Sequence, residues 1–167
     1  MKKQIAFAMS LMVLASCGGT RWNETQTEYG FNVVTQKKGR TLAYSPASGV
    51  TLLTVDGYAF KDMNRNGSLD VYEDWRKESG ERAEDLADRM TIDQIAGLML
   101  YSSHVAVNDA VPTEKLLSMV KDDNIRHILV TEVKNARTAA QWHNNLQAIV
   151  ESLPLAVPTN NSSDPRN

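Results

Sequence analysis

The chain has 167 residues, of which 42% are hydrophobic and 23% charged, and its formal net charge at pH 7 is -2. This composition is that of a globular protein and excludes a chain disordered throughout, while the charge gives no sign of a nucleic-acid partner. The single cysteine excludes an internal disulfide framework, so stability outside the cytoplasm would come from packing, from a metal or from a larger body of protein.

The first residues have the pattern of an export signal. Two lysines precede an apolar run at residues 5–15, which is too short to span a bilayer comfortably. The run ends in LASC, which resembles a bacterial lipobox, a motif whose cysteine takes a diacylglycerol and becomes the mature N-terminus. We therefore predict a lipoprotein signal peptide at residues 1–17, lipidation of Cys17, export to the periplasm or outer membrane, and attachment to the membrane through the lipid anchor. The alternative is a plain cleaved signal that happens to contain a cysteine.

Residues 18–57 are largely polar with scattered aromatic side chains, and we interpret them as a leader or linker. Within them, residues 50–55 are rich in β-branched side chains and lie between Gly49 and the pair Asp56-Gly57. That pattern predicts a strand followed by a turn.

The stretch DMNRNGSLDVYE, residues 62–73, fits every constrained position of an EF-hand calcium loop. Such a loop needs oxygen ligands at positions 1, 3, 5, 7, 9 and 12 and a glycine at position 6. The predicted ligands are Asp62, Asn64, Asn66, Ser68 (through its carbonyl), Asp70 and Glu73. We predict a structural Ca²⁺ held at the weak extracellular end of the affinity range, about 10⁻⁴ to 10⁻³ M, because only three ligands are ionised. The alternative is a solvated Asn-Gly turn between a strand and a helix.

The flanks of this loop predict only half of an EF-hand. Residues 57–60 before it are extended in pattern, and a short helix is expected after it at residues 72–77. The unit at residues 58–79 would therefore be a static clamp that fastens the leader to the rest of the chain, since calcium switching needs a pair of helices to reorient.

Beyond Gly80 the apolar residues recur at helical spacing. One helix is expected at about residues 81–90, and Thr91 has the pattern of an N-cap for a second helix. The predicted buried stripe of that second helix comprises Ile92, Ile95, Ala96 and Met99.

The remaining chain alternates between helical and strand patterns. Helices are expected at residues 113–121 and 135–152, and strands at residues 127–130 and 155–157. This order predicts parallel strands joined by helical crossovers, as in an eight-stranded (β/α) barrel or an open doubly wound sheet. No Gly-x-Gly-x-x-Gly follows a strand, so a dinucleotide-binding sheet has no support.

Three segments, in the right order, resemble glycoside hydrolase family 3. RAEDLADRMTIDQIAGLML is similar to the family's opening segment, VPTNNSSDPRN resembles one of its strand ends, and FKDMNRNGSLDVYEDW looks like the leader of secreted bacterial members. The resemblance implies an α/β fold, the first strands of an incomplete (β/α)8 TIM barrel at residues 80–167. It also implies a retaining, exo-acting, β-glucosidase-like glycosidase whose substrate is an oligosaccharide or β-glucoside.

Few of the family's functional residues fall within this chain. Asp164 stands where the family places a carboxylate that binds sugar hydroxyls, so the resemblance implies a substrate-binding role. A carboxylate can accept two charge-assisted hydrogen bonds from adjacent hydroxyls and so fix the sugar ring. The alternative is an Asp-Pro turn residue. The resemblance places the nucleophile on a later barrel strand and the acid/base later still, both beyond Asn167. Asn167 itself occupies a position where many members have histidine.

A complete (β/α)8 barrel takes about 250 residues, whereas the pattern after Met90 supplies about three strands. We therefore expect a truncated chain whose partner is the remainder of the enzyme, with poor solubility and no turnover alone.

Two classes of function remain open. The first is the N-terminal portion of an exported glycosidase acting in carbohydrate breakdown. The second is a non-enzymatic calcium-binding surface lipoprotein that supports adhesion or assembly.

Overall fold

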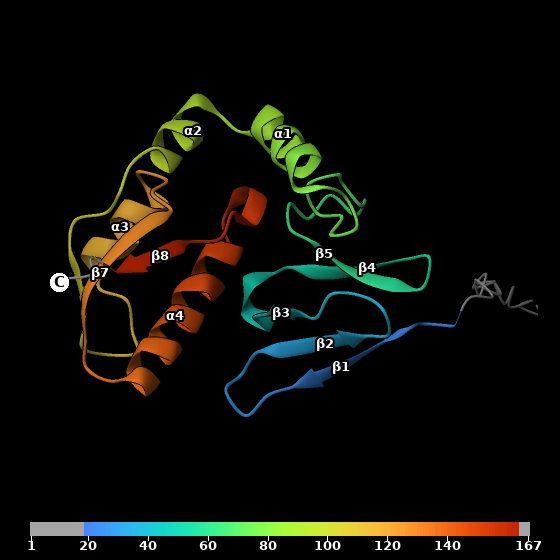
Figure 1. The fold of residues 1–167 in the computed structure, drawn as a ribbon, viewed down its shortest axis with the longest axis horizontal. Helices are drawn as coiled ribbons and strands as arrows, with labels where there is room; N and C mark the ends of the chain where they lie inside the picture. The colour runs from blue at the N-terminus through green and yellow to red at the C-terminus, as the bar shows by residue number, and fades with distance from the viewer. Residues whose placement is uncertain (1–18, 164–167) are drawn as a thin grey trace, which may run out of the picture.

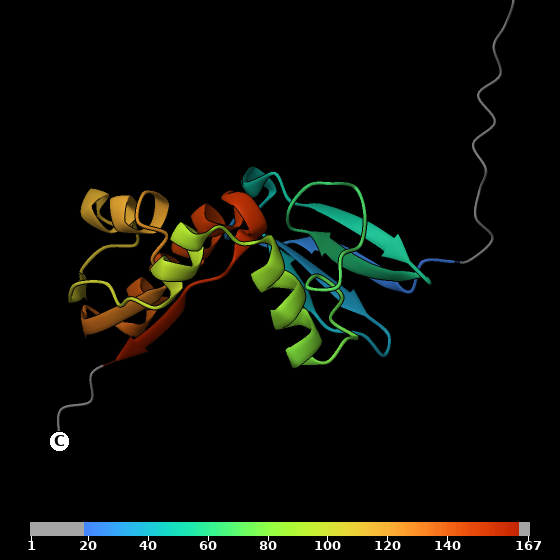
Figure 2. The ribbon, with the colours of Figure 1, turned by 90° about the horizontal axis from the view of Figure 1, so that it is seen from above.

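The computed structural model describes residues 19–163, which form a β-rich part (residues 19–62) and an α/β part (residues 79–163). Figure 1 shows the order of the elements, and Figure 2 shows the two parts side by side with helix α1 (Ser79–Arg89) near their junction. The predicted signal peptide, Cys17 and Asp164 lie outside the described residues. No helix in the described part of the chain is long and apolar enough to cross a membrane.

The β-rich part contains two antiparallel sheets. The first has three strands in the order β1-β2-β3, and the second is the hairpin β4-β5. The strands are β1 (Trp22–Gln26), β2 (Asn32–Gln36), β3 (Leu42–Tyr44), β4 (Thr51–Val55) and β5 (Tyr58–Asp62). The predicted strand at residues 50–55 and the extended residues after it are confirmed. Asp56 and Gly57 both have positive φ, 54° and 83°, as a tight two-residue hairpin turn requires.

Strands β1 to β3 stand where a polar leader or linker was expected, and that expectation missed them. Only Val34 is fully buried in these three strands, and four of the five residues of β1 are exposed. Because a sheet with so little buried surface carries only a weak alternation of apolar and polar residues, its strands leave little trace in the sequence.

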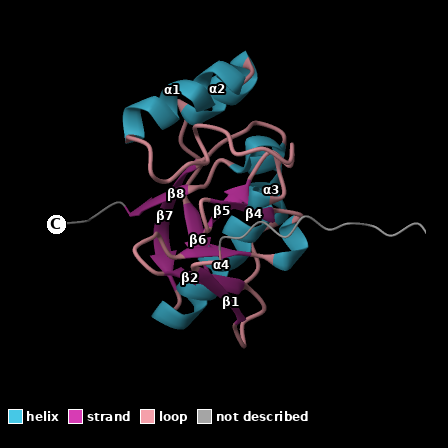
Figure 3. Ribbon diagram, turned by 90° about the vertical axis from the view of Figure 1, so that its right-hand side faces the viewer, coloured by secondary structure: helices cyan, strands magenta, loops and turns pink. Residues whose placement is uncertain are grey.

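Helices α1 (Ser79–Arg89) and α2 (Ile92–Leu98) lie together on one side of the molecule, as Figure 3 shows. Thr91 is the N-cap of α2 as predicted, and its side chain accepts a hydrogen bond from the Gln94 N–H. The predicted helix at residues 72–77 is wrong, because that segment forms successive turns.

The predicted buried stripe of α2 is also wrong. Ile92 and Met99 are 84% and 81% exposed, and Ile95 and Ala96 are exposed as well. The helix packs instead through Gly97, where an added Cβ would lie 2.5 Å from the carbonyl oxygens of Asp123 and Asn124. This close approach turns the apolar stripe away from the described body of the protein.

The α/β part is built on a parallel sheet in the order β6-β7-β8. Its elements are β6 (Val105–Val107), α3 (Glu114–Lys121), β7 (His127–Val133), α4 (Ala136–Glu151) and β8 (Asn160–Ser163). The predicted helices, the strand at residues 127–130 and the parallel pairing are confirmed. Strand β6 was missed, and the strand expected at residues 155–157 is wrong. A short 3-10 helix, η2 (Pro154–Ala156), occupies most of that stretch, and the strand begins at Asn160.

The hydrophobic core lies between this sheet and helices α3 and α4. Its members are Val105, Val107, Leu116, Val120, Ile125, Ile128, Trp142, Leu146 and Val150. The described chain is thus a mixed α/β protein with three parallel strands, compatible with an incomplete α/β domain.

Candidate functional site

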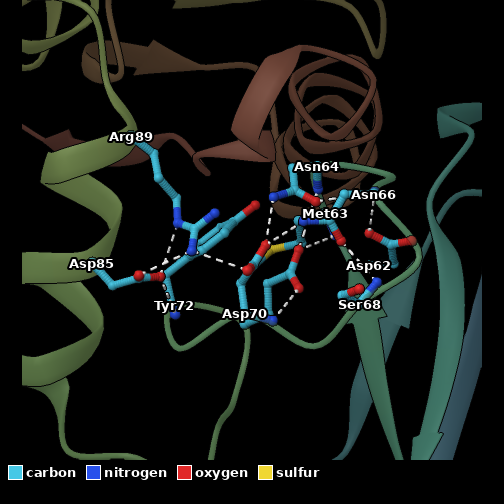
Figure 4. A network of polar contacts seen from close by, with 10 residues as sticks. Asp62, Met63, Asn64, Asn66, Ser68, Asp70, Tyr72, Asp85 and Arg89 are labelled. Atoms are coloured by element: carbon cyan, nitrogen blue, oxygen red, sulfur yellow. Dashed lines mark hydrogen bonds and ion pairs between the residues drawn. The ribbon is translucent and has the colours of Figure 1, made fainter.

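The candidate calcium loop, residues 62–73, begins at the end of β5 and is ordered by hydrogen bonds from its own backbone (Figure 4). Asp62 is buried, and its two carboxylate oxygens accept from the N–H groups of Asn66 at 3.0 Å and Gly67 at 2.9 Å. The side-chain oxygens of Asn64 and Asn66 accept from the N–H groups two residues on, at 3.2 and 2.8 Å. Gly67, with φ of 77°, supplies the left-handed turn that the pattern required at position 6.

The two later acidic residues close the loop. The Asp70 carboxylate accepts from the side-chain amides of Asn64 and Asn66, both at 2.7 Å. Glu73 is buried and accepts from the N–H groups of Met63 at 2.7 Å, Asn64 at 3.2 Å and Asp70 at 3.1 Å. Burial raises the pKa of Glu73, while these N–H donors act in the opposite direction.

The structure therefore brings the side chains of five predicted ligands into one connected network; Ser68 was expected to contribute its carbonyl. Within residues 19–163, no three acidic, histidine or cysteine side chains form a group that could hold a metal. The donor set is oxygen throughout, which is the chemistry that Ca²⁺ prefers, but both oxygens of Glu73 face N–H groups. Calcium at this loop stays a prediction.

The loop is fastened to the C-terminal end of α4. Arg65, at an unconstrained position of the loop, donates from Nη2 to the carbonyl oxygens of Ser48 at 2.8 Å and Glu151 at 2.7 Å. The Glu151 side chain forms an ion pair with Lys61 and accepts from the Ser45 N–H at 3.1 Å. The loop thus bonds to the Glu151 backbone carbonyl, while the nearly buried Glu151 carboxylate joins α4 to β5 and to Ser45. The sequence pattern held no signal for it, because its partners lie about 90 to 106 residues away.

The loop is fastened to α1 as well (Figure 4). The Arg89 guanidinium lies 2.9 Å from Asp70 and 3.0 Å from Asp85, and it lies over the Tyr72 ring at 5.6 Å. Asp85 also accepts from the Tyr72 N–H at 3.0 Å. The hydrogen bond from Arg89 holds the pKa of Asp85 below its usual value. Asp62 to Glu73 therefore form a junction between the two parts of the molecule.

The second candidate site is the edge of the parallel sheet where its strands end. Val107 pairs with Val133, and Val130 pairs with Ser163, so the carboxyl ends of β6, β7 and β8 lie at one edge. Substrate contacts in parallel α/β proteins come from this edge. Asp164 follows β8 directly, but it lies outside the described residues, and its predicted sugar contact is untested.

No family model matches the chain. It is 36% identical over 126 residues to the periplasmic β-glucosidase/β-xylosidase of Dickeya chrysanthemi, an alignment covering 71% of the chain and 19% of that protein. It is 27% identical over 133 residues to the probable β-glucosidase C of Aspergillus oryzae (strain ATCC 42149 / RIB 40), covering 72% of the chain and 20% of that protein. The chain spans about a fifth of the length of these curated relatives.

Proposed function

We propose that this chain, a relative of the β-glucosidases, provides the first strands of the catalytic barrel in a retaining exo-glycosidase of glycoside hydrolase family 3. The observation that carries the proposal is the kinship with two glucosidases, one bacterial and one fungal. The parallel order β6-β7-β8, with α3 and α4 as crossovers, supports it, because a (β/α) barrel is built from such units. Further strand and helix units are needed to close that barrel.

In this proposal the carboxyl edge of the sheet receives the sugar. Asp164, next to the end of β8, accepts hydrogen bonds from two adjacent hydroxyls and fixes the ring for attack. Retaining hydrolysis needs two further carboxyl groups about 5 to 5.5 Å apart, one as nucleophile and one as acid/base. We assign neither to a residue of this chain.

The test begins with the gene. Reading the coding DNA past the codon for Asn167 should reveal further strand-end carboxylates, and the full product should release p-nitrophenol from p-nitrophenyl β-D-glucoside. NMR of the first sugar released should show the β anomer, since retention is expected. A stop codon at that point, together with no hydrolysis by the chain, would contradict the proposal and favour the non-enzymatic surface lipoprotein.

We also propose that Ca²⁺ is the structural partner of residues 62–73. Bound there, it would supply fixed positive charge to oxygens that the network now satisfies with N–H groups, and so strengthen the junction. Calorimetric titration of the folded chain should give a dissociation constant of about 10⁻⁴ to 10⁻³ M, and Asp62→Ala should abolish the heat. Asp109→Ala, which changes an exposed aspartate in a distant turn, is the matched control. No heat with folded protein would overturn this proposal.

Export and anchoring form the last part of the proposal. The bacterial relative is named periplasmic, which is consistent with an exported chain. Acylation of Cys17 would hold the protein at the membrane surface. Cys17→Ser should move it from the membrane fraction to the soluble fraction of lysed cells, and an unchanged distribution would contradict lipidation.

A further inference from the structure

A hollow of about 670 Å³ lies between the tip of the β1-β2 hairpin and helix α4. Figure 1 shows this hairpin beside the first half of α4. Glu28 and Tyr29 line it from the hairpin, and Arg137, Gln141 and Asn144 line it from the helix. The volume falls within the range of about 300 to 1,000 Å³ that is typical of small-molecule sites.

The tip of the hairpin carries a solvent-exposed aromatic side chain. Tyr29 is 66% exposed. The turn that carries it is closed by hydrogen bonds from the Thr27 N–H to the Phe31 carbonyl at 2.9 Å and from the Gly30 N–H to the Thr27 carbonyl at 3.1 Å. The Thr27 hydroxyl donates to the same Phe31 carbonyl at 2.9 Å. The backbone beneath Tyr29 is therefore fixed, although its ring faces solvent.

Helix α4 presents a row of three polar side chains to the hollow. Arg137, Gln141 and Asn144 recur at helical spacing on one face of α4, while Trp142 and Leu146 on the other face are buried in the core. Within residues 19–163, no ion pair or side-chain hydrogen bond engages these three polar side chains, so no described residue competes with a ligand for them.

We infer that this hollow is a second carbohydrate-binding site, distinct from the carboxyl edge of the parallel sheet. A tyrosine ring offers a flat apolar surface to the C–H face of a pyranose, and the amides of Gln141 and Asn144 can both donate to and accept from neighbouring hydroxyls. Glu28 and Arg137 carry opposite charges, so the hollow as a whole favours a neutral ligand over a polyanion. The choice of a glucan as that neutral ligand rests on the proposed function.

The position of the hollow gives it a different task from catalysis. The residues of α4 that line it lie on the face opposite those that pack on the sheet, and Ala110, three residues beyond the end of β6, lines it as well. A glycan bound against Tyr29 and α4 would therefore lie beside the carboxyl edge of the sheet and leave the strand ends open. Such a site would hold the protein against a longer β-glucan, while another segment of the same glucan reached the catalytic edge.

Titration of the ¹⁵N-labelled chain with cellotetraose tests this inference by NMR. Saturable shift changes are expected at Tyr29, Gln141 and Asn144, with millimolar or tighter affinity. Tyr29→Ala should weaken binding about tenfold or more, because the stacking surface is lost. Gln141→Ala provides a second, helix-side variant whose folding does not depend on the hairpin, and it should also weaken binding.

Tyr101→Ala is the matched control, because Tyr101 is a similarly exposed tyrosine, at 58%, that lies against His127. It should leave the affinity unchanged. Absence of shift changes at the hollow, or equal weakening by the control, would overturn the inference. Binding at Tyr29 together with no glycosidase activity in the full product of the gene would contradict only the proposed function, and activity of that product without binding there would contradict only this second site.

Discussion

The two parts of the molecule are held together by different forces. The α/β part has one continuous apolar core of nine buried side chains between a parallel sheet and two helices. The β-rich part buries few large side chains, among them Val34 and Phe60. It is attached to α4 by the ion pair Lys61–Glu151 and to α1 through the loop, by the ion pair Arg89–Asp70. Packing against a core stabilises more than partly exposed polar contacts do, so the first part should tolerate a lost contact less well.

The largest effect should come from the core. Leu146 on α4 is fully buried, and Leu146→Ala should lower the free energy of unfolding by about 2 to 5 kcal/mol, because a cavity is left behind. Urea denaturation followed by circular dichroism measures it. Lys115→Ala on the exposed face of α3 should change the value by less than about 0.5 kcal/mol. Similar effects of the two changes would show that the α/β part is not held by its core.

The contact of α2 with the α/β part should be nearly as sensitive. Gly97→Ala places a methyl group 2.5 Å from two backbone carbonyl oxygens, so the helix must move, at a cost of about 1 to 3 kcal/mol. Gly80→Ala in α1 meets nothing within 4 Å and should be neutral or stabilising by up to about 1 kcal/mol. Thermal unfolding of both variants gives the comparison, and a neutral Gly97→Ala would mean that α2 does not pack there.

The attachment of the β-rich part should depend on the pair Lys61–Glu151. Glu151→Gln keeps the shape but removes the charge, and we expect a loss of about 1 to 2 kcal/mol because the pair is mostly shielded from water. The exposed pair Lys77–Glu81 should contribute only about 0.3 to 0.5 kcal/mol. Double-mutant cycles on both pairs separate the two values, and equal coupling energies would remove the special role of Glu151.

Acid should weaken the contact between the loop and α1 by a smaller amount. The pKa of Asp85 is lowered by its hydrogen bonds to Arg89, so this group adds stability above its unfolded pKa of about 3.9, and that stability disappears as the pH falls through the folded pKa. The urea midpoint between pH 7 and pH 2.5 measures the loss. Asp85→Asn should reduce the slope below pH 4, and an unchanged slope would show that Asp85 does not contribute.

The same contrast explains what the sequence could predict. Helices α3 and α4 and strand β7 bury regular apolar faces, and their spacing revealed them. Strands β1 to β3 bury almost nothing and were missed. The oxygen-bearing residues that the structure joins in one network at residues 62–73 were recognisable from their fixed spacing, and calcium binding there stays a prediction. Arg65 and Glu151 were not, since their contacts join segments far apart in the chain. The apolar stripe of α2 was wrongly predicted to be buried, because Gly97, rather than the apolar residues, packs against Asp123 and Asn124.

The measurement that tests the account most directly is the effect of Asp164→Asn on β-glucoside hydrolysis by the full product of the gene. Loss of a charge-assisted contact to the sugar should lower kcat/KM about 10- to 100-fold. Asp123→Asn, which changes an exposed aspartate before β7 at the opposite edge of the sheet, should leave it unchanged. Full activity in the Asp164→Asn enzyme would contradict the assignment of the sheet's carboxyl edge as the sugar site.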